Sequence, residues 1–104
     1  MKSIAEIQSL VTPICKKHHI PKLYLFGSYA TGRAQQNSDI DFVIDTSNLH
    51  GLLELLLVKQ ELEAVCEVPV DLLTLRAIQK EESNPLKKDF IRNFYQERMC
   101  LYEQ

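Results

Sequence analysis

The sequence predicts a small α/β or α+β fold with one layer of sheet, and three observations support this class. Apolar residues recur at helical spacing near the start of the chain. Short runs rich in β-branched and aromatic residues are bounded by Gly or Pro, and the two kinds of segment alternate. The 104 residues are enough for one domain, 1–104, with a thin hydrophobic core.

The first predicted elements are a helix at residues 3–18 and a strand at Lys22–Phe26. Ser3 and Glu6 have the spacing of a capping box, and the apolar residues after them follow helical intervals. Pro13 is expected to kink or shorten this helix, because proline removes a backbone donor. The strand is apolar on both faces, which is typical of a central strand covered from both sides.

A turn bounded by glycines follows this strand. Gly27 ends the strand at a point where the chain must turn sharply. Ser28 is expected to cap a short helix over residues 29–31, and Gly32 is expected to stop it. A polar loop over residues 33–37 then leads to the next strand.

The rest of the chain alternates between strands and helices and ends in a long helix. The predicted elements are a strand at residues 39–45, a helix at 51–66, a strand at 70–75, a helical turn at 77–82 and a helix at 85–102. The final helix has more apolar and aromatic surface than one thin sheet requires. We expect it to pack against the first helix or to dock on a partner, and one helix can do both.

The overall charge argues against a surface that binds duplex nucleic acid. The formal net charge is -2 and the isoelectric point is about 5.9, whereas duplex binding normally requires a basic patch. No apolar run is long enough for a signal peptide or a membrane span, so a cytoplasmic location is expected. Cys15, Cys66 and Cys100 form no CxxC pair and are interpreted as buried free thiols.

Two aspartates begin the otherwise apolar strand at residues 39–45. Because side chains alternate along a strand, Asp39 and Asp41 project from one face, about 6.6 Å apart. Two such carboxylates repel each other unless a cation or proton lies between them, and Mg²⁺ prefers oxygen ligands of this kind. Asp71 lies in the next apolar strand and can converge on the same point if the two strands are neighbours.

Each aspartate also has an ordinary structural explanation. Asp39 can cap a turn, Asp41 can lie on the surface of an edge strand, and Asp71 can pair with a lysine or arginine. Taken singly, these explanations are the simpler ones. Three aspartates behind a Gly-Ser turn favour a metal–phosphate site, because Gly27 offers backbone without side-chain bulk and Ser28 offers a hydroxyl donor.

Two other groups of residues have competing interpretations. His18 and His19 are adjacent at the end of the first helix and point in different directions. A favourable interaction with the helix dipole explains them better than metal ligation or acid–base chemistry. Tyr29 lies in the turn and is a candidate contact for a base or ribose, with simple surface exposure as the alternative.

Three motifs together resemble the signature of the polymerase-beta-like nucleotidyltransferases. They are Gly27-Ser28-Tyr29-Ala30-Thr31-Gly32, Ser38-Asp39-Ile40-Asp41 and Val70-Asp71-Leu72-Leu73. The short chain is similar to the minimal nucleotidyltransferase (MNT) domain of that superfamily over nearly its whole length. The resemblance implies an α+β fold with a small mixed sheet and helices packed on it. MNT domains are commonly encoded beside a HEPN-domain protein and act as the antitoxin of that pair, which implies a cognate HEPN toxin as partner.

The resemblance also implies roles for individual residues. Asp39 and Asp41 are expected to bind the Mg²⁺ ions that carry the nucleotide phosphates. Asp71 is expected to complete the metal site and to help activate the attacking hydroxyl. Gly27 and Ser28 are expected to hold the β- and γ-phosphates.

One position departs from the family pattern. Many relatives carry an arginine where this chain has Thr31, and Arg33 is expected to substitute as a phosphate contact. In the antitoxin branch, ATP is the donor and the acceptor is a tyrosine hydroxyl of the HEPN ribonuclease toxin. The resemblance therefore implies transfer of AMP to the toxin, which neutralises it.

Two other functions remain open. The chain can be a non-catalytic antitoxin that neutralises the HEPN toxin by direct binding. Alternatively, the same site can transfer a nucleotide to a small molecule such as an aminoglycoside, although the chain has no second domain to form a small-molecule pocket. A homodimer and a hetero-oligomer with the partner are both compatible with the apolar final helix.

Overall fold

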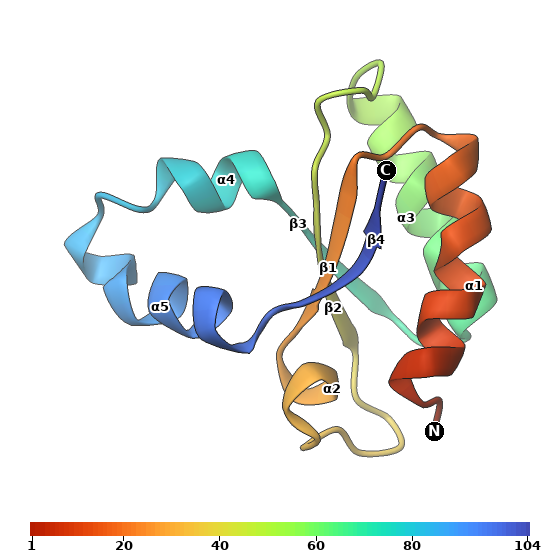
Figure 1. The fold of residues 1–104 in the computed structure, drawn as a ribbon, viewed down its shortest axis with the longest axis horizontal. Coiled ribbons are helices and arrows are strands. Elements are labelled where there is room, and N and C mark those ends of the chain that lie inside the picture. Colours follow the sequence, from red (N-terminus) through yellow and green to blue (C-terminus); the bar gives the residue numbers. More distant parts are fainter.

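Four short strands form one mixed sheet in the computed structural model, which describes all residues 1–104 (Figure 1). The strands are β1 (Lys22–Phe26), β2 (Ile40–Ile44), β3 (Val70–Thr74) and β4 (Met99–Glu103), in the spatial order β3-β2-β1-β4. β1 pairs antiparallel with both β2 and β4, and β2 pairs parallel with β3. The predicted α+β class and the central position of the first strand are confirmed.

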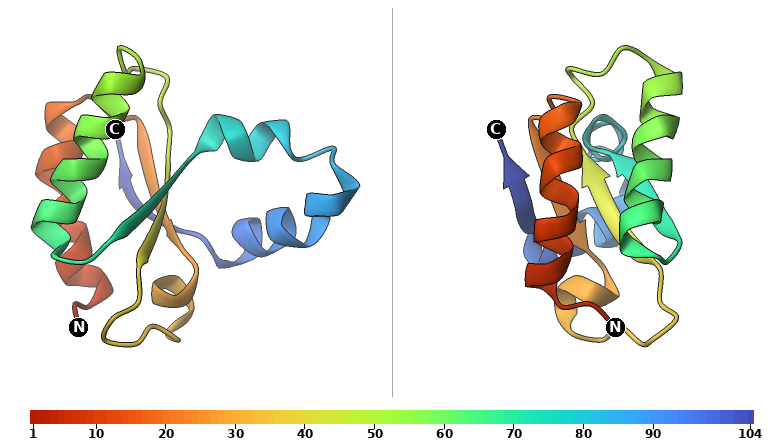
Figure 2. Two further views of the ribbon diagram at one scale, coloured as in Figure 1. Left: turned by 180° about the vertical axis from the view of Figure 1, so that it is seen from behind. Right: turned by 90° about the vertical axis from the view of Figure 1, so that its right-hand side faces the viewer.

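Two long helices cover one face of the sheet (Figure 2). These are α1 (Ile4–Lys17) and α3 (Leu52–Cys66), and apolar side chains of both helices join those of β1 and β2 in the main core. The predicted capping box of Ser3 and Glu6 is present at the start of α1. Pro13 lies inside α1, which continues to Lys17, so proline does not end this helix early.

Shorter helices cover the opposite face. They are α4 (Leu75–Lys80), a 3-10 turn at Pro85–Lys87 and α5 (Lys88–Glu97). A second, smaller core lies beneath them, formed by Tyr24, Val43, Ile78, Ile91 and Phe94. The expectation that the last helix packs against the first is therefore wrong, because α5 and α1 lie on opposite sides of the sheet (Figure 2).

The predicted helix at residues 85–102 is also wrong in its last part. Helix α5 ends at Glu97, and Arg98 takes extended backbone angles (φ −61, ψ 145). The following residues form β4, whose Leu101 is buried and whose Leu101 carbonyl accepts a hydrogen bond from the Gln8 side chain at 2.8 Å. The apolar residues of this segment suit a helix or a strand equally well. Antiparallel pairing with the edge of β1 that β2 leaves free selects the strand.

The cysteines divide into two environments. Cys15 and Cys66 are buried, as predicted, and burial raises the pKa of the Cys15 thiol to about 12. Cys100 is exposed on β4, so the expectation that all three thiols are buried is wrong for this one. No helix combines the length and the apolar character needed to cross a bilayer.

Candidate functional site

Two of the predicted aspartates are direct neighbours across the sheet. The parallel pairing of β2 with β3 sets Asp41 opposite Asp71, and the antiparallel pairing of β1 with β2 sets Phe26 opposite Asp41. Residues paired in register project from the same face of a sheet. One row on the face that carries α4 and α5 therefore contains Phe26, Asp41 and Asp71, and we call its two aspartates the carboxylate row. Asp39 lies one residue before β2. The condition set for Asp71, that its strand lies next to the strand of Asp41, is therefore met.

Electrostatic repulsion is concentrated on Asp41. Burial raises the pKa of the Asp41 carboxyl above its usual range, and the negative charges of Asp71 and Asp39 raise it further. Asp41 is half-buried, whereas Asp39 and Asp71 are exposed. The fold thus holds a partly desolvated carboxylate beside two others, which is unfavourable unless a cation or proton binds there.

Gly27 lies directly against the Asp41 carboxylate. Its backbone has φ +73, and a Cβ atom added to it would lie 2.3 Å from Asp41 Oδ2. The left-handed φ favours glycine, and a Cβ atom here would also displace the Asp41 carboxylate. The turn after β1 therefore brings bare backbone to the carboxylate row, as the sequence predicted.

A short helix, α2 (Ser28–Thr31), begins at this turn. Its N-cap residue is Gly27, which has no side chain to cap the helix, so the prediction that Ser28 caps it is wrong. Ser28 is instead the first helical residue. Gly32 ends the helix with a left-handed backbone, as predicted.

Arg33 is tied to the turn after β1 by Thr31. The Arg33 Nε atom donates a hydrogen bond to Thr31 Oγ1 at 3.0 Å, and Thr31 Oγ1 donates to the Gly27 carbonyl at 3.1 Å. The Arg33 guanidinium also lies 3.7 Å from Glu97 Oε1 at the end of α5. The sequence did not indicate Glu97, since it is far from Arg33 along the chain and belongs to no motif.

Tyr29 does not have the position predicted for a base or ribose contact. Its ring is buried in the main core with residues of α1 and β2. Because a buried ring cannot stack on a bound base, both the contact and the surface alternative are wrong for Tyr29.

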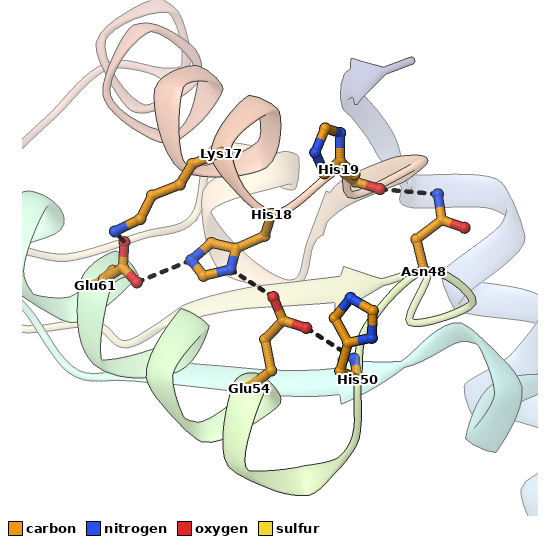
Figure 3. A network of polar contacts seen from close by, with 7 residues as sticks. All are labelled: Lys17, His18, His19, Asn48, His50, Glu54 and Glu61. Carbon is orange, nitrogen blue, oxygen red and sulfur yellow. Dashed lines mark hydrogen bonds and ion pairs between the residues drawn. The ribbon is translucent and has the colours of Figure 1, made fainter.

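His18 forms a second polar cluster on the other face of the sheet (Figure 3). His18 Nδ1 lies 2.9 Å from Glu54 Oε2, and His18 Nε2 lies 2.9 Å from Glu61 Oε2. Burial on its own lowers the pKa of His18, but the hydrogen bonds and charges of the two glutamates outweigh it, so the pKa is raised. This His18 cluster (His18, Glu54 and Glu61) joins α1 to α3. The predicted interaction of His18 with the dipole of α1 is therefore an incomplete explanation of this residue. Its partners Glu54 and Glu61 lie far along the chain, so no local sequence pattern indicates them.

The three aspartates are suited to a hard divalent cation by their chemistry. As the side chains stand, no three His, Cys, Asp or Glu residues are grouped so as to hold one ion. However, the donors are all carboxylate oxygens, and the repulsion that raises the pKa of Asp41 is the kind that a bound cation relieves. By the type of donor atom, Asp39, Asp41 and Asp71 are the candidate ligands for such a cation.

Comparisons with known proteins point to one family. The polymerase beta nucleotidyltransferase domain family matches residues 10–104. The chain is 38% identical over 91 residues to the candidate protein adenylyltransferase MJ0435 of Methanocaldococcus jannaschii, covering 88% of this chain and 92% of that protein. It is 30% identical over 77 residues to the protein adenylyltransferase MntA of Thermococcus cleftensis, covering 70% of this chain and 78% of MntA.

Solved structures share the fold. A toxin–antitoxin structure with AMP-PNP matches with a TM-score of 0.69 at 21% identity, covering 93% of this chain and 73% of the matched chain. The complex of a tri-AMPylated HEPN toxin of Shewanella oneidensis with its MNT antitoxin matches with a TM-score of 0.64 at 17% identity, covering 97% of this chain and 73% of the matched chain. The domain match and the relative at 38% identity show that this chain belongs to the polymerase-beta nucleotidyltransferase family.

Proposed function

We propose that this protein is an antitoxin that transfers AMP from ATP to a tyrosine hydroxyl of a cognate HEPN ribonuclease toxin. The observation that carries the proposal is the row of Asp41 and Asp71 with the Gly27 backbone against it. A partly buried carboxylate with two acidic neighbours destabilises the fold, and a role in binding a metal and phosphates would explain why this carboxylate is present.

The proposed roles are those that the family resemblance implies, and the neighbouring positions of Asp41, Asp71 and Gly27 support them. Asp39 and Asp41 would hold Mg²⁺ together with Asp71, and the bound metal would supply Lewis-acid stabilisation of the phosphate charge. Gly27 and Ser28 would contact the β- and γ-phosphates.

Asp71 is exposed and so can be reached by an acceptor hydroxyl. In the proposed reaction Asp71 takes the proton of the acceptor as its oxygen bonds to the α-phosphorus. The bond from that phosphorus to the bridging oxygen breaks, and pyrophosphate leaves.

Arg33 is proposed as a further phosphate contact. Its guanidinium carries a permanent positive charge, and the Thr31 hydroxyl anchors it beside the turn that begins at Gly27. This arrangement supports the idea that Arg33 serves in place of the arginine that many relatives have at position 31.

The relatives support the nature of the donor and the acceptor. MJ0435 and MntA are both named as protein adenylyltransferases, the first as a candidate. One structural neighbour is a toxin–antitoxin structure with AMP-PNP, and another is a complex with an AMPylated HEPN toxin. By analogy, ATP is the donor and a HEPN protein is the acceptor for this chain.

A second candidate function is neutralisation by binding alone. Helix α3 exposes apolar side chains, with Leu52 at 69% and Leu53 at 83% exposure, which is unusual for a helix of a small monomer. Such a surface favours a stable complex with a partner. This function would need neither ATP nor the aspartates.

The two functions are separated by one transfer assay. The protein is incubated with ATP labelled at the α-phosphate, Mg²⁺ and a candidate cognate HEPN protein, and transfer of label to a tyrosine of that protein is measured. We expect transfer by the wild type, loss of transfer in the Asp39→Asn plus Asp41→Asn variant, and normal transfer in the exposed control Asp89→Asn.

Two results would contradict the catalytic proposal. One is a wild type that transfers no AMP, and the other is equal transfer by the double variant. Tight complex formation without ATP, together with rescue of growth by the double variant, would support neutralisation by binding.

A further inference from the structure

A partly apolar hollow lies beside the carboxylate row. It has a volume of about 310 Å³ and is formed between α4 and α5, at the low end of the range of about 300–1,000 Å³ that ligand sites usually occupy. Its apolar lining includes Leu73, Ala77, Ile78 and Phe90. Glu81 and Lys87 contribute a carboxylate and an ammonium group to the same lining.

Two contacts connect this hollow to the proposed site. Leu73 follows Asp71 by two residues in β3, so both side chains project from the same face about 6.6 Å apart. The Phe90 ring lies edge-to-face on Phe26 with 6.2 Å between centroids, and Phe26 is paired with Asp41. The hollow is therefore next to the carboxylate row on the same side of the sheet.

We propose that this hollow binds the nucleobase of the donor nucleotide, and that it suits an amino-bearing base such as adenine. The inference rests on the proposed nucleotidyltransferase function and adds a base site to it. Phe90 is 40% exposed and offers an aromatic surface to a planar ring. The Glu81 carboxylate can accept a hydrogen bond from an exocyclic amine, and the Lys87 ammonium can donate one to a ring nitrogen.

The spacing favours the donor base over other occupants. In a nucleotide the base is separated from the α-phosphate by one sugar. The reacting phosphate is expected at Asp71. The hollow begins at Leu73, two residues further along β3. A base in the hollow would leave the exposed side of Asp71 open to the acceptor hydroxyl.

Filling the hollow tests the proposal. Ala77 is exposed on α4 and lines the hollow, so Ala77→Phe should occupy it. Equilibrium binding of ATP and of inorganic tripolyphosphate, which has no base, is measured in the presence of Mg²⁺. Loss of base stacking predicts about tenfold weaker ATP binding with unchanged tripolyphosphate binding. The matched control is Ala64→Phe on the exposed side of α3, which should change neither.

A second variant keeps the test decisive if Ala77→Phe fails to fold. Phe90→Leu retains an apolar side chain without an aromatic face and should weaken ATP binding while sparing tripolyphosphate. Unchanged ATP binding in folded variants overturns the base site. This conclusion also holds when those variants lose AMP transfer, because a loss of transfer without a loss of ATP binding would indicate that the hollow holds the acceptor.

A wild type that binds ATP no more tightly than tripolyphosphate overturns the base site alone. A wild type that binds neither ligand overturns the proposed function and the base site together.

Discussion

Replacing His18 by Gln should destabilise the protein in a pH-dependent way. The ring is buried, and both of its nitrogens lie 2.9 Å from a glutamate oxygen, which a neutral imidazole cannot satisfy because it has one donor only. The geometry therefore indicates a charged imidazolium that links α1 to α3 (Figure 3). Glutamine has no charge and reaches at most one of the two carboxylates.

The size of the effect follows from the exposure of the partners. A hydrogen bond to a charged group contributes about 1.5–3 kcal/mol, and His18 makes two. The Glu54 and Glu61 side chains keep 21% and 22% exposure, so water screens the pairs and rehydrates the glutamates when the ring is removed. We therefore expect a loss of about 2 kcal/mol in the free energy of unfolding for the whole substitution. In a domain of this size that corresponds to a fall of roughly 10 °C in Tm.

The direction of the pH dependence follows from the shifted pKa values. The pKa of His18 is raised above its usual value of 6.5, so its contribution is complete below about pH 6.5 and is lost as the pH rises through the folded-state value. For Glu54, the hydrogen bond from His18 lowers the pKa. For Glu61, burial opposes the hydrogen bonds from His18 and Lys17, which prevail and lower the pKa. The glutamate contributions are therefore lost as the pH falls below about 4.5.

Chemical denaturation at pH 5.5 and at pH 9 tests this reasoning. The difference between wild type and His18→Gln should be near its full value at pH 5.5 and clearly smaller at pH 9. The matched control is His50→Gln, an exposed histidine of the same region, whose effect should be within about 0.5 kcal/mol at both pH values. A difference between wild type and His18→Gln that is equal at both pH values would show that the imidazolium charge does not stabilise the fold.

Three further predictions concern the carboxylate row and the thiols. Gly27→Ala should weaken nucleotide binding and lower Tm, since position 27 has a left-handed φ of +73 and its Cβ would displace the Asp41 carboxylate; unchanged ATP affinity in a binding titration would contradict this. Asp41→Asn should raise the Tm of the metal-free protein at neutral pH, because it removes a carboxylate whose pKa is raised by burial and by Asp71 and Asp39, and Mg²⁺ should stabilise the wild type but not this variant. A thiol reagent should modify Cys100 rapidly and the two buried cysteines only after denaturation, as counted by mass spectrometry; fast labelling of a second thiol in the native protein would refute the burial.

The local patterns of the sequence predicted most elements, because their signals lie within a few residues. The capping box at Ser3, the strand Lys22–Phe26 and the αL glycine at position 32 are of this kind. Ser28 was predicted wrongly as a cap because the glycine before it takes that position. The segment after Arg98 was predicted wrongly because its apolar spacing fits helix and strand alike, and the choice depends on pairing with β1.

The sequence by itself determined which chemical groups are available: the Gly-Ser turn, the two aspartates at the start of one strand and the third in another. Only the tertiary structure decided which of them meet. The parallel register of β2 and β3 places Asp41 opposite Asp71, and the left-handed backbone of Gly27 beside the Asp41 carboxylate explains why that position favours glycine. The same holds for His18 and its glutamates, since contacts between distant segments depend on packing of whole elements, and no local spacing encodes them.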